Sequence, residues 1–187
     1  SASMVIKFSD EFKAILAGAR DEAMRTGHYG IGADHLMLAI LRRRGCEAFR
    51  FLSEAGLDTG GLKRRIDEAV FREKPVPYND EDKIGMKRSA AGAVSLAAYE
   101  ALKAGAPEVR STHLLLALSR AEDSVSRAWL TEHSLGSAAL RESLEKKGLS
   151  GNSPGRPEVR MKDVVSALGE QLTNLVNAHR DRTGYVS

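Results

Sequence analysis

Asp34-His35-Leu36-Met37-Leu38-Ala39-Ile40-Leu41 is the stretch that decides the fold, because it recurs as Thr112-His113-Leu114-Leu115-Leu116-Ala117-Leu118. Position 113 lies 78 residues after position 35, and the same spacing relates the two halves over about sixty residues without a gap. Further identical pairs at this spacing are Ala19/Ala97, Glu22/Glu100, Ala23/Ala101, Gly27/Gly105, Leu52/Leu130, Glu54/Glu132, Leu57/Leu135 and Leu62/Leu140. The chain is therefore a duplicated unit.

Each of the two apolar stretches predicts a short helix that is buried on nearly all sides. Polar residues stand only at the entry and exit of the stretch, which is typical of a buried rather than an amphipathic helix. A buried strand is the alternative, but Leu, Met and Ala favour helix and β-branched residues are scarce there. We expect the cores of the two units to contain Leu36, Leu38, Ile40, Leu114, Leu116 and Leu118.

Apolar periodicity and helix-end signals predict four helices in each unit. Ser9 is a plausible N-cap for the first helix, and Gly27 is placed to end it. The expected helices cover about residues 9–26, 33–45, 46–55 and 59–71 in the first unit, and about 87–104, 111–120, 124–133 and 137–147 in the second.

Composition shifts divide the rest of the chain. Two stretches rich in Pro, Gly or charge predict linkers, and the C-terminal part has apolar residues at helical spacing without a counterpart in the repeats. The predicted organisation is a tag remnant and lead-in at 1–7, repeats at 8–71 and 85–148, linkers at 72–84 and 149–160, and a C-terminal helix and tail at 161–187.

Overall composition limits the classes of function. The chain has 187 residues, a formal net charge of +3 and one cysteine, Cys46, so it can form no intramolecular disulfide and no cysteine-based zinc site. No run approaches the roughly twenty apolar residues of a membrane span. Basic and acidic residues alternate along the helices instead of forming a basic stripe. We therefore expect a cytoplasmic protein that binds neither nucleic acid nor membrane.

Together the motifs resemble a known family. A Phe8-Ser9 lead-in, an alanine-rich helix ending in Gly27-His28, and Gly32-Ala33-Asp34-His35-Leu36-Met37-Leu38, with the pattern duplicated at this period, resemble the N-terminal domain of the Clp/Hsp100 unfoldases, in the ClpC and ClpA branch. The similarity covers about residues 8–147. It implies an all-α fold of two tandem four-helix repeats related by a pseudo-twofold axis.

The resemblance also implies a function without chemistry of its own. Such domains bind substrate proteins and adaptors and pass substrates to an attached AAA+ ATPase ring, without a cofactor or a metal. The sequence contains no Gly-x-x-x-x-Gly-Lys-Ser/Thr phosphate loop. The chain is thus expected to be a piece of a longer unfoldase or, alternatively, a stand-alone adaptor or regulator. An uncharacterised hydrolase is a distant third hypothesis, because no catalytic constellation converges in the sequence.

In the ClpC branch this domain resembles a reader of phosphorylated arginine, with a hydroxyl residue at the start of the first helix and a carboxylate before the histidine. The matching positions are Phe8, Ser9 and Asp34 in the first repeat, and Lys87 and Thr112 in the second. A carboxylate can hold a guanidinium while a hydroxyl and helix-terminal amides hold the phosphate. We therefore expect a substrate or adaptor site in the first repeat and a degenerate twin in the second.

Three other features have a functional and a structural interpretation. His35 and His113 could be catalytic or metal ligands, but neutral buried histidines whose ring N–H groups bind backbone carbonyls fit better. Cys46 could be a reactive thiol at a helix start, or a small buried N-cap. The stretch Gly151-Asn152-Ser153-Pro154-Gly155 matches the Gly-x-Ser-x-Gly nucleophile pattern, but it lies in a predicted linker with no strand before it.

Overall fold

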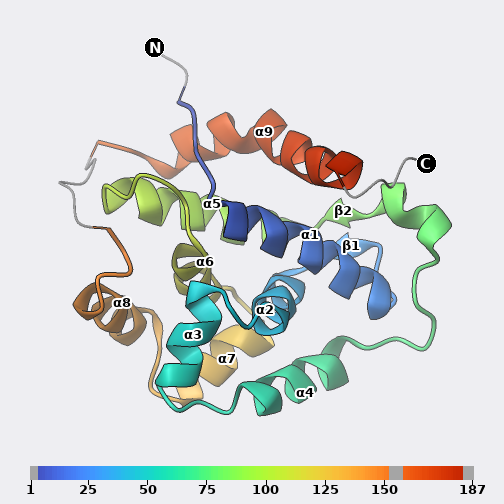
Figure 1. Cartoon of the computed structure of the whole chain (residues 1–187), viewed down its shortest axis with the longest axis horizontal. Helices are drawn as coiled ribbons and strands as arrows, with labels where there is room; N and C mark the ends of the chain where they lie inside the picture. Colours follow the sequence, from blue (N-terminus) through green and yellow to red (C-terminus); the bar gives the residue numbers. More distant parts are fainter. Residues whose placement is uncertain (1–3, 152–157, 183–187) are drawn as a thin grey trace.

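The computed structural model describes residues 4–151 and 158–182, and the side chains of the last helix only as far as Leu172 and without that of Glu170. The fold is all-α with two four-helix repeats, as the sequence predicts (Figure 1). The first repeat contains α1 (Asp10–Arg25), α2 (Ala33–Arg42), α3 (Glu47–Glu54) and α4 (Thr59–Val70). The second contains α5 (Arg88–Lys103), α6 (Ser111–Leu118), α7 (Val125–Glu132) and α8 (Ser137–Lys146).

The two repeats keep the same register in three dimensions. Every helix of the second repeat begins 78 positions after its counterpart, at Arg88, Ser111, Val125 and Ser137 against Asp10, Ala33, Glu47 and Thr59. Gly27 and Gly105 follow the first helix of each repeat with φ angles of +84° and +69°, a backbone region that favours glycine. One boundary was wrong: α2 ends at Arg42 rather than near Gly45, because the chain must turn before Cys46 caps α3.

The central helices α2 and α6 form the heart of one shared core. All six leucine and isoleucine side chains expected in the core are buried, with exposures of 0–3%. Helix α2 contacts α1 and α4 in its own repeat and α5, α6 and α7 in the other. The hydrophobic core is therefore continuous across the repeats, which explains why these helices are apolar all round.

Backbone pairing between extended segments joins the two repeats. Strands β1 (Gly30–Ile31) and β2 (Gly85–Met86) are parallel, with Ile31 opposite Met86. Phe8 forms a parallel bridge with Val109. Because Phe8 and Val109 are the counterparts of Met86 and Ile31, the same contact occurs twice with the repeats exchanged, as a twofold relation requires. The sequence did not predict these short strands, which accompany an otherwise all-α architecture.

Residues 72–84, expected as a linker, fold onto the first repeat. They contain the 3-10 helix η1 (Tyr78–Lys83), and the amide of the buried Val76 donates to the Met24 carbonyl over 2.9 Å. In η1, the Glu81 carboxylate lies 2.8 Å from the Arg20 guanidinium of α1, and both side chains are buried. A buried pair of this kind fixes the position of the segment, since separating the charges would leave each of them unpaired.

Helix α9 (Met161–Arg182) is the expected C-terminal helix without a counterpart. It packs against both α1 and α5, the first helices of the two repeats, as Figure 1 shows in red above them. Val164 and Leu168 are its buried residues among the side chains described. Within the described part of the chain, no helix is long and apolar enough to cross a membrane.

The enclosure of the central helices predicts a large effect of truncating their side chains. Replacing Leu38→Ala or Leu116→Ala should lower the free energy of unfolding by about 2–5 kcal/mol, because each change removes buried methyl groups and leaves a cavity. Val165→Ala, at a side chain that is 51% exposed, is the control and should change it by less than about 0.5 kcal/mol. Urea unfolding measures all three, and equal midpoints for Leu38→Ala and the control would contradict the packing.

Candidate functional site

His35 is a structural cap at the start of α2. Its Nδ1 accepts a hydrogen bond from the Gly32 amide at 2.9 Å. Its Nε2 lies 3.0 Å from the Thr26 hydroxyl, which itself donates to the Glu22 carbonyl over 2.7 Å. Because Nδ1 accepts and the hydroxyl proton is already used, Nε2 carries the proton and the ring is neutral.

His113 has the same role in α6. Its Nδ1 accepts from the Arg110 amide at 2.9 Å, and its Nε2 lies 2.7 Å from the Ser150 carbonyl. The prediction of buried neutral histidines is thus confirmed, and the backbone carbonyl acceptor is found for His113. At His35 the acceptor is a threonine hydroxyl instead. Both rings are fully used in these contacts, so neither is positioned as a catalytic base.

Burial keeps both imidazoles uncharged. Desolvation lowers the pKa of His35 to about 4, and the nearby His28 and Lys87 act in the same direction. Desolvation also lowers the pKa of His113, and the Arg110 charge contributes in the same sense. Protonation of either ring would therefore oppose folding.

Ser9 and Phe8, predicted as binding residues, lie where the lead-in meets the second repeat. The Ser9 hydroxyl caps α1 by accepting from the Phe12 amide at 3.0 Å, and the Ser9 amide donates to the Val109 carbonyl over 3.0 Å. Phe8 is buried and packs against the ring of Phe12, with centroids 4.8 Å apart. Both residues therefore hold the lead-in in place, and Ser9 also lines a groove described below.

Asp34 holds α7 of the other repeat. One carboxylate oxygen accepts from the Ser126 amide at 2.9 Å and the Ser126 hydroxyl at 2.6 Å, and the other accepts from the Val125 amide at 3.0 Å. These are free amides of the first turn of α7, where a negative charge is favourable. The carboxylate is thus engaged in joining the repeats.

Thr112 and Lys87, the two residues of the degenerate twin site, differ in burial. Thr112 is fully buried and donates to the Leu149 carbonyl over 2.8 Å. Lys87 is exposed at the start of α5, and its amide donates to the Ile31 carbonyl over 2.8 Å. The exchange between repeats therefore places Lys87 beside the segment that leads to Asp34.

By the same exchange, Ser9 lies beside the segment that leads to Thr112, since its amide bonds to Val109. The sequence predicts a site in which Ser9 and Asp34 act together within one repeat. The groove that Ser9 lines does not include Asp34.

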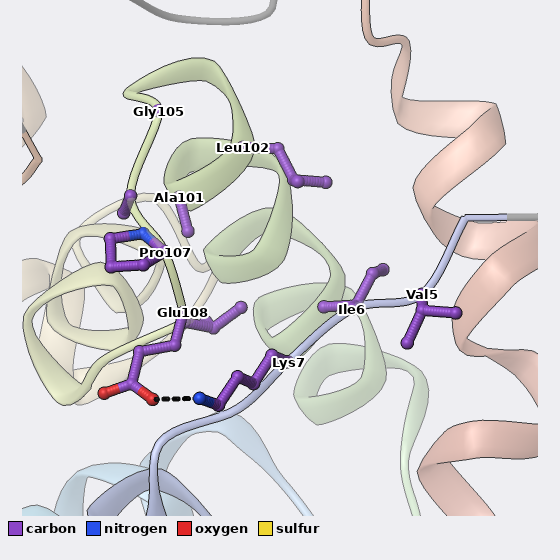
Figure 2. Close-up of a pocket in the computed structure, with 10 residues that line it drawn as sticks. Val5, Ile6, Lys7, Ala101, Leu102, Gly105, Pro107 and Glu108 are labelled. Atoms are coloured by element: carbon purple, nitrogen blue, oxygen red, sulfur yellow. Dashed lines mark ion pairs between the residues drawn. The ribbon is translucent and has the colours of Figure 1, made fainter. Parts of the chain in front are cut away.

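Two grooves flank an ion pair between the lead-in and the second repeat, in which Lys7 Nζ lies 3.9 Å from Glu108 Oε2. Figure 2 shows the first groove, of about 430 Å³, where the lead-in runs beside the end of α5. We name it the apolar groove, for its residues Val5, Ile6, Ala101, Leu102, Pro107 and Val109. The second, the acidic groove, has about 380 Å³ and contains Ser9, Asp10, Glu11, Glu47 and Glu108.

The acidic groove combines carboxylates from both repeats. Glu11 accepts from the Ser111 hydroxyl at 2.6 Å, and both of its oxygens lie 3.3 Å from the Glu47 amide at the start of α3. Glu47 is paired with Arg110. Asp10 and Glu108 lie at the rim, where each forms a long ion pair of 3.9 Å with a lysine among the residues described. A cationic ligand would therefore be attracted to this groove, and an anionic one repelled.

Sequence reasoning missed the glutamates of this groove. Glu11, Glu47 and Glu108 come from positions far apart in the chain, and none belongs to the repeated motif. Negative charge in the first turns of α1 and α3 was the available signal, but it indicates helix capping as well.

Cysteine chemistry and metal binding find no support in the described residues. Cys46 is buried, its Sγ accepts from the Phe49 amide at 3.3 Å, and burial raises the pKa of the thiol. Its interpretation as a buried N-cap is confirmed. Among the residues described, no group of His, Cys, Asp and Glu side chains could hold a metal ion. The serine of the Gly-x-Ser-x-Gly match, Ser153, lies outside the described residues.

Comparison with known proteins agrees with this architecture. Residues 7–133 match the family model described as the Clp repeat (R) N-terminal domain. The sequence is 28% identical over 120 residues to the negative regulator of genetic competence ClpC/MecB of Bacillus subtilis, covering 64% of this chain and 14% of that protein. It is 25% identical over 179 residues to the chaperone protein ClpB of Rhodopseudomonas palustris, covering 95% of this chain and 20% of that protein. The chain thus spans a fifth or less of these relatives.

Solved structures share the fold at lower sequence identity. The Hsp104 N-terminal domain from Candida albicans superposes with a TM-score of 0.60 at 17% identity, covering 79% of this chain and 96% of that one. The N-terminal domain of the chaperone ClpD from Arabidopsis thaliana gives a TM-score of 0.51 at 14% identity, covering 92% and 99%. At these identities the likeness concerns the fold alone.

The buried neutral state of His35 predicts a pH dependence of stability. Its folded pKa of about 4 lies below the unfolded value of 6.5, so this contribution to stability is fully present above pH 6.5 and is lost as the pH falls toward 4. The loss should reach up to about 3 kcal/mol. Urea unfolding between pH 7 and pH 4 should show a smaller decrease for His35→Gln than for the wild type, and equal decreases would contradict the assignment.

Proposed function

The chain belongs to the Clp repeat (R) N-terminal domain family, and from this membership we propose that it is a non-catalytic protein-binding domain of a Clp-type ATP-dependent unfoldase system. Its ligands are substrate proteins or adaptors. It passes substrates to a AAA+ Clp ATPase ring, in the same chain or in another. The observation that carries the proposal is the match over residues 7–133, which covers the first repeat, α5 to α7 of the second repeat and all residues that line the acidic groove.

The acidic groove is the proposed contact site for a partner segment. The acidic groove has walls from both repeats, and the apolar groove lies between the lead-in and the second repeat. The shape of each groove therefore depends on the contact between the N-terminal half and the second repeat. Carboxylates outnumber lysines in the acidic groove, and the adjoining apolar groove offers the exposed Val5 and the half-buried Leu102 to an apolar side chain. A short segment with basic and apolar residues suits this combination.

Phosphoarginine, the ligand that the resemblance implies for Ser9 and Asp34, fits the same residues less well. Its guanidinium would have to displace Val125 and Ser126 from the Asp34 carboxylate. Its phosphate would approach Glu11 beside Ser9. We therefore propose an unphosphorylated basic segment as the ligand.

Charge reversal at the rim tests this proposal. Glu108→Lys should weaken binding of a fluorescent arginine- and leucine-rich peptide about tenfold, because it replaces attraction by repulsion. Glu68→Lys, at an exposed residue of α4 outside both grooves, is the matched control and should leave the affinity near that of the wild type. Anisotropy titrations measure both, and binding should weaken as salt is added.

The same titration separates the two ligands. The peptide with phosphorylated arginines should bind more weakly than the unphosphorylated one. Tighter binding of the phosphorylated form, with loss in Asp34→Ala, would contradict the acidic groove and support a site at Asp34. Equal affinities for the Glu108→Lys and Glu68→Lys variants would exclude the acidic groove.

A further inference from the structure

A third groove lies on the first repeat, between α1, α2 and the segment that precedes η1. It has a volume of about 630 Å³. We name it the α1–α2 groove, and the argument concerns its residues Gly18, Arg25, Ala39, Arg42, Val76 and Tyr78. It shares no lining residue with the apolar or the acidic groove. The α1–α2 groove is therefore a separate surface.

The floor of this groove is open because the first repeat has a glycine where the second has a leucine. Gly18 of α1 is the counterpart of Leu96 of α5, which is half-buried and packs against the core. A Cβ atom on Gly18 would lie 3.4 Å from the Cβ of Ala39, an ordinary van der Waals contact. A leucine would therefore fit at position 18, and its absence leaves an apolar depression on the first repeat.

The outer wall of the groove is held in place by the backbone. The Val76 amide donates to the Met24 carbonyl of α1 over 2.9 Å, and the Val76 side chain is buried. Pro75 and Pro77 on either side restrict the backbone further. Tyr78, which is 72% exposed, extends this wall. The groove is thus preformed, as most ligand sites are.

Positive charge prevails among the charged groups that a ligand would meet at the groove. Glu22 accepts hydrogen bonds from Nε of Arg25 and Nε of Arg42, both at 3.0 Å. The Glu22 side chain is only 6% exposed, whereas those of Arg25 and Arg42 are 32% and 51% exposed. Asp21 also lines the groove and is exposed. Arg43, which follows Arg42, is exposed and forms no ion pair with another described residue. A carboxylate-bearing ligand would therefore be attracted.

We propose that the α1–α2 groove is a docking site for a short acidic segment of a partner protein. A leucine-sized side chain of the segment fills the depression over Gly18, the position that Leu96 occupies in the second repeat. Carboxylates next to that side chain bind the guanidinium groups of Arg42 and Arg43, since guanidinium and carboxylate match in geometry. This ligand is opposite in charge to the basic segment proposed for the acidic groove, so the two proposals stand independently.

Filling the groove tests the proposal on the full-length chain. The probe is a rhodamine-labelled peptide in which leucine pairs alternate with glutamate pairs, and its affinity is measured by anisotropy. Gly18→Leu should weaken binding at least about tenfold, because the new side chain occupies the space of the ligand. Gly92→Leu is the matched control, since Gly92 is an exposed glycine of α5 at which a Cβ would meet no atom within 4 Å. It should leave the affinity near that of the wild type.

Charge reversal beside the groove tests the electrostatic part. Arg43→Glu should weaken binding of the same peptide about tenfold, and Arg127→Glu, at an exposed residue of α7, should not. Arg43 is chosen because Arg42 holds the buried Glu22 and its loss would disturb the fold. A peptide with serine in place of leucine should also bind about tenfold more weakly, because it lacks the side chain for the depression.

Far-UV circular dichroism and urea unfolding establish that Gly18→Leu is folded. If it is not, Gly18→Ala replaces it and should give a smaller loss in the same direction. Equal affinities for Gly18→Leu and Gly92→Leu, equal affinities for Arg43→Glu and Arg127→Glu, or no binding to the wild type would overturn the proposal. The arginine- and leucine-rich peptide should bind the wild type and Gly18→Leu equally, so failure of this proposal is distinguishable from failure of the acidic groove.

Discussion

Exchange of the extended segments between the repeats is the contact on which the rest of the structure depends. Phe8 pairs with Val109 and Met86 with Ile31, so each repeat holds the lead-in of the other. The exchange allows α2 and α6 to share one core, and α9 packs against the first helix of each repeat. A repeat alone would expose both its lead-in and one side of its central helix. We infer that the double repeat is the smallest folding unit of this chain.

Helix capping across the boundary between the repeats reinforces this exchange. It also engages the polar side chains near the boundary in hydrogen bonds. Asp34 of the first repeat caps α7 in the second, and Glu11 of α1 accepts from Ser111 in α6. Neutral, buried His35 closes the start of α2 next to the same boundary. Residues that the family resemblance associates with ligands thus have structural roles here, and the rim carboxylates Asp10 and Glu108 are the groups that we propose for contact with a partner.

Local signals explain what could be predicted from the sequence. The N-cap Ser9, the terminating Gly27 and the apolar run at Leu36 are signals within a few residues, and all were interpreted correctly. The exchange of lead-ins depends on backbone groups 101 positions apart, such as those of Phe8 and Val109, and backbone pairing leaves no mark on side-chain composition. The acidic groove could not be predicted either, because its carboxylates come from positions far apart in the chain. Within the repeated motif, the sequence also could not reveal that Asp34 reaches α7, because a carboxylate that binds a ligand and one that caps a helix look alike.

Native-state hydrogen exchange tests the central claim most directly, namely that the exchanged segments and the shared core form one cooperative unit. The amides of Ser9 and Lys87 donate to Val109 and Ile31 across the boundary, and their protection can be compared with that of Leu38 and Leu116 in the central helices. All four amides should open with the same free energy and the same dependence on denaturant, since losing the exchange dissolves the core. Exchange of Ser9 and Lys87 by a low-energy local opening, with both central helices still protected, would contradict the account.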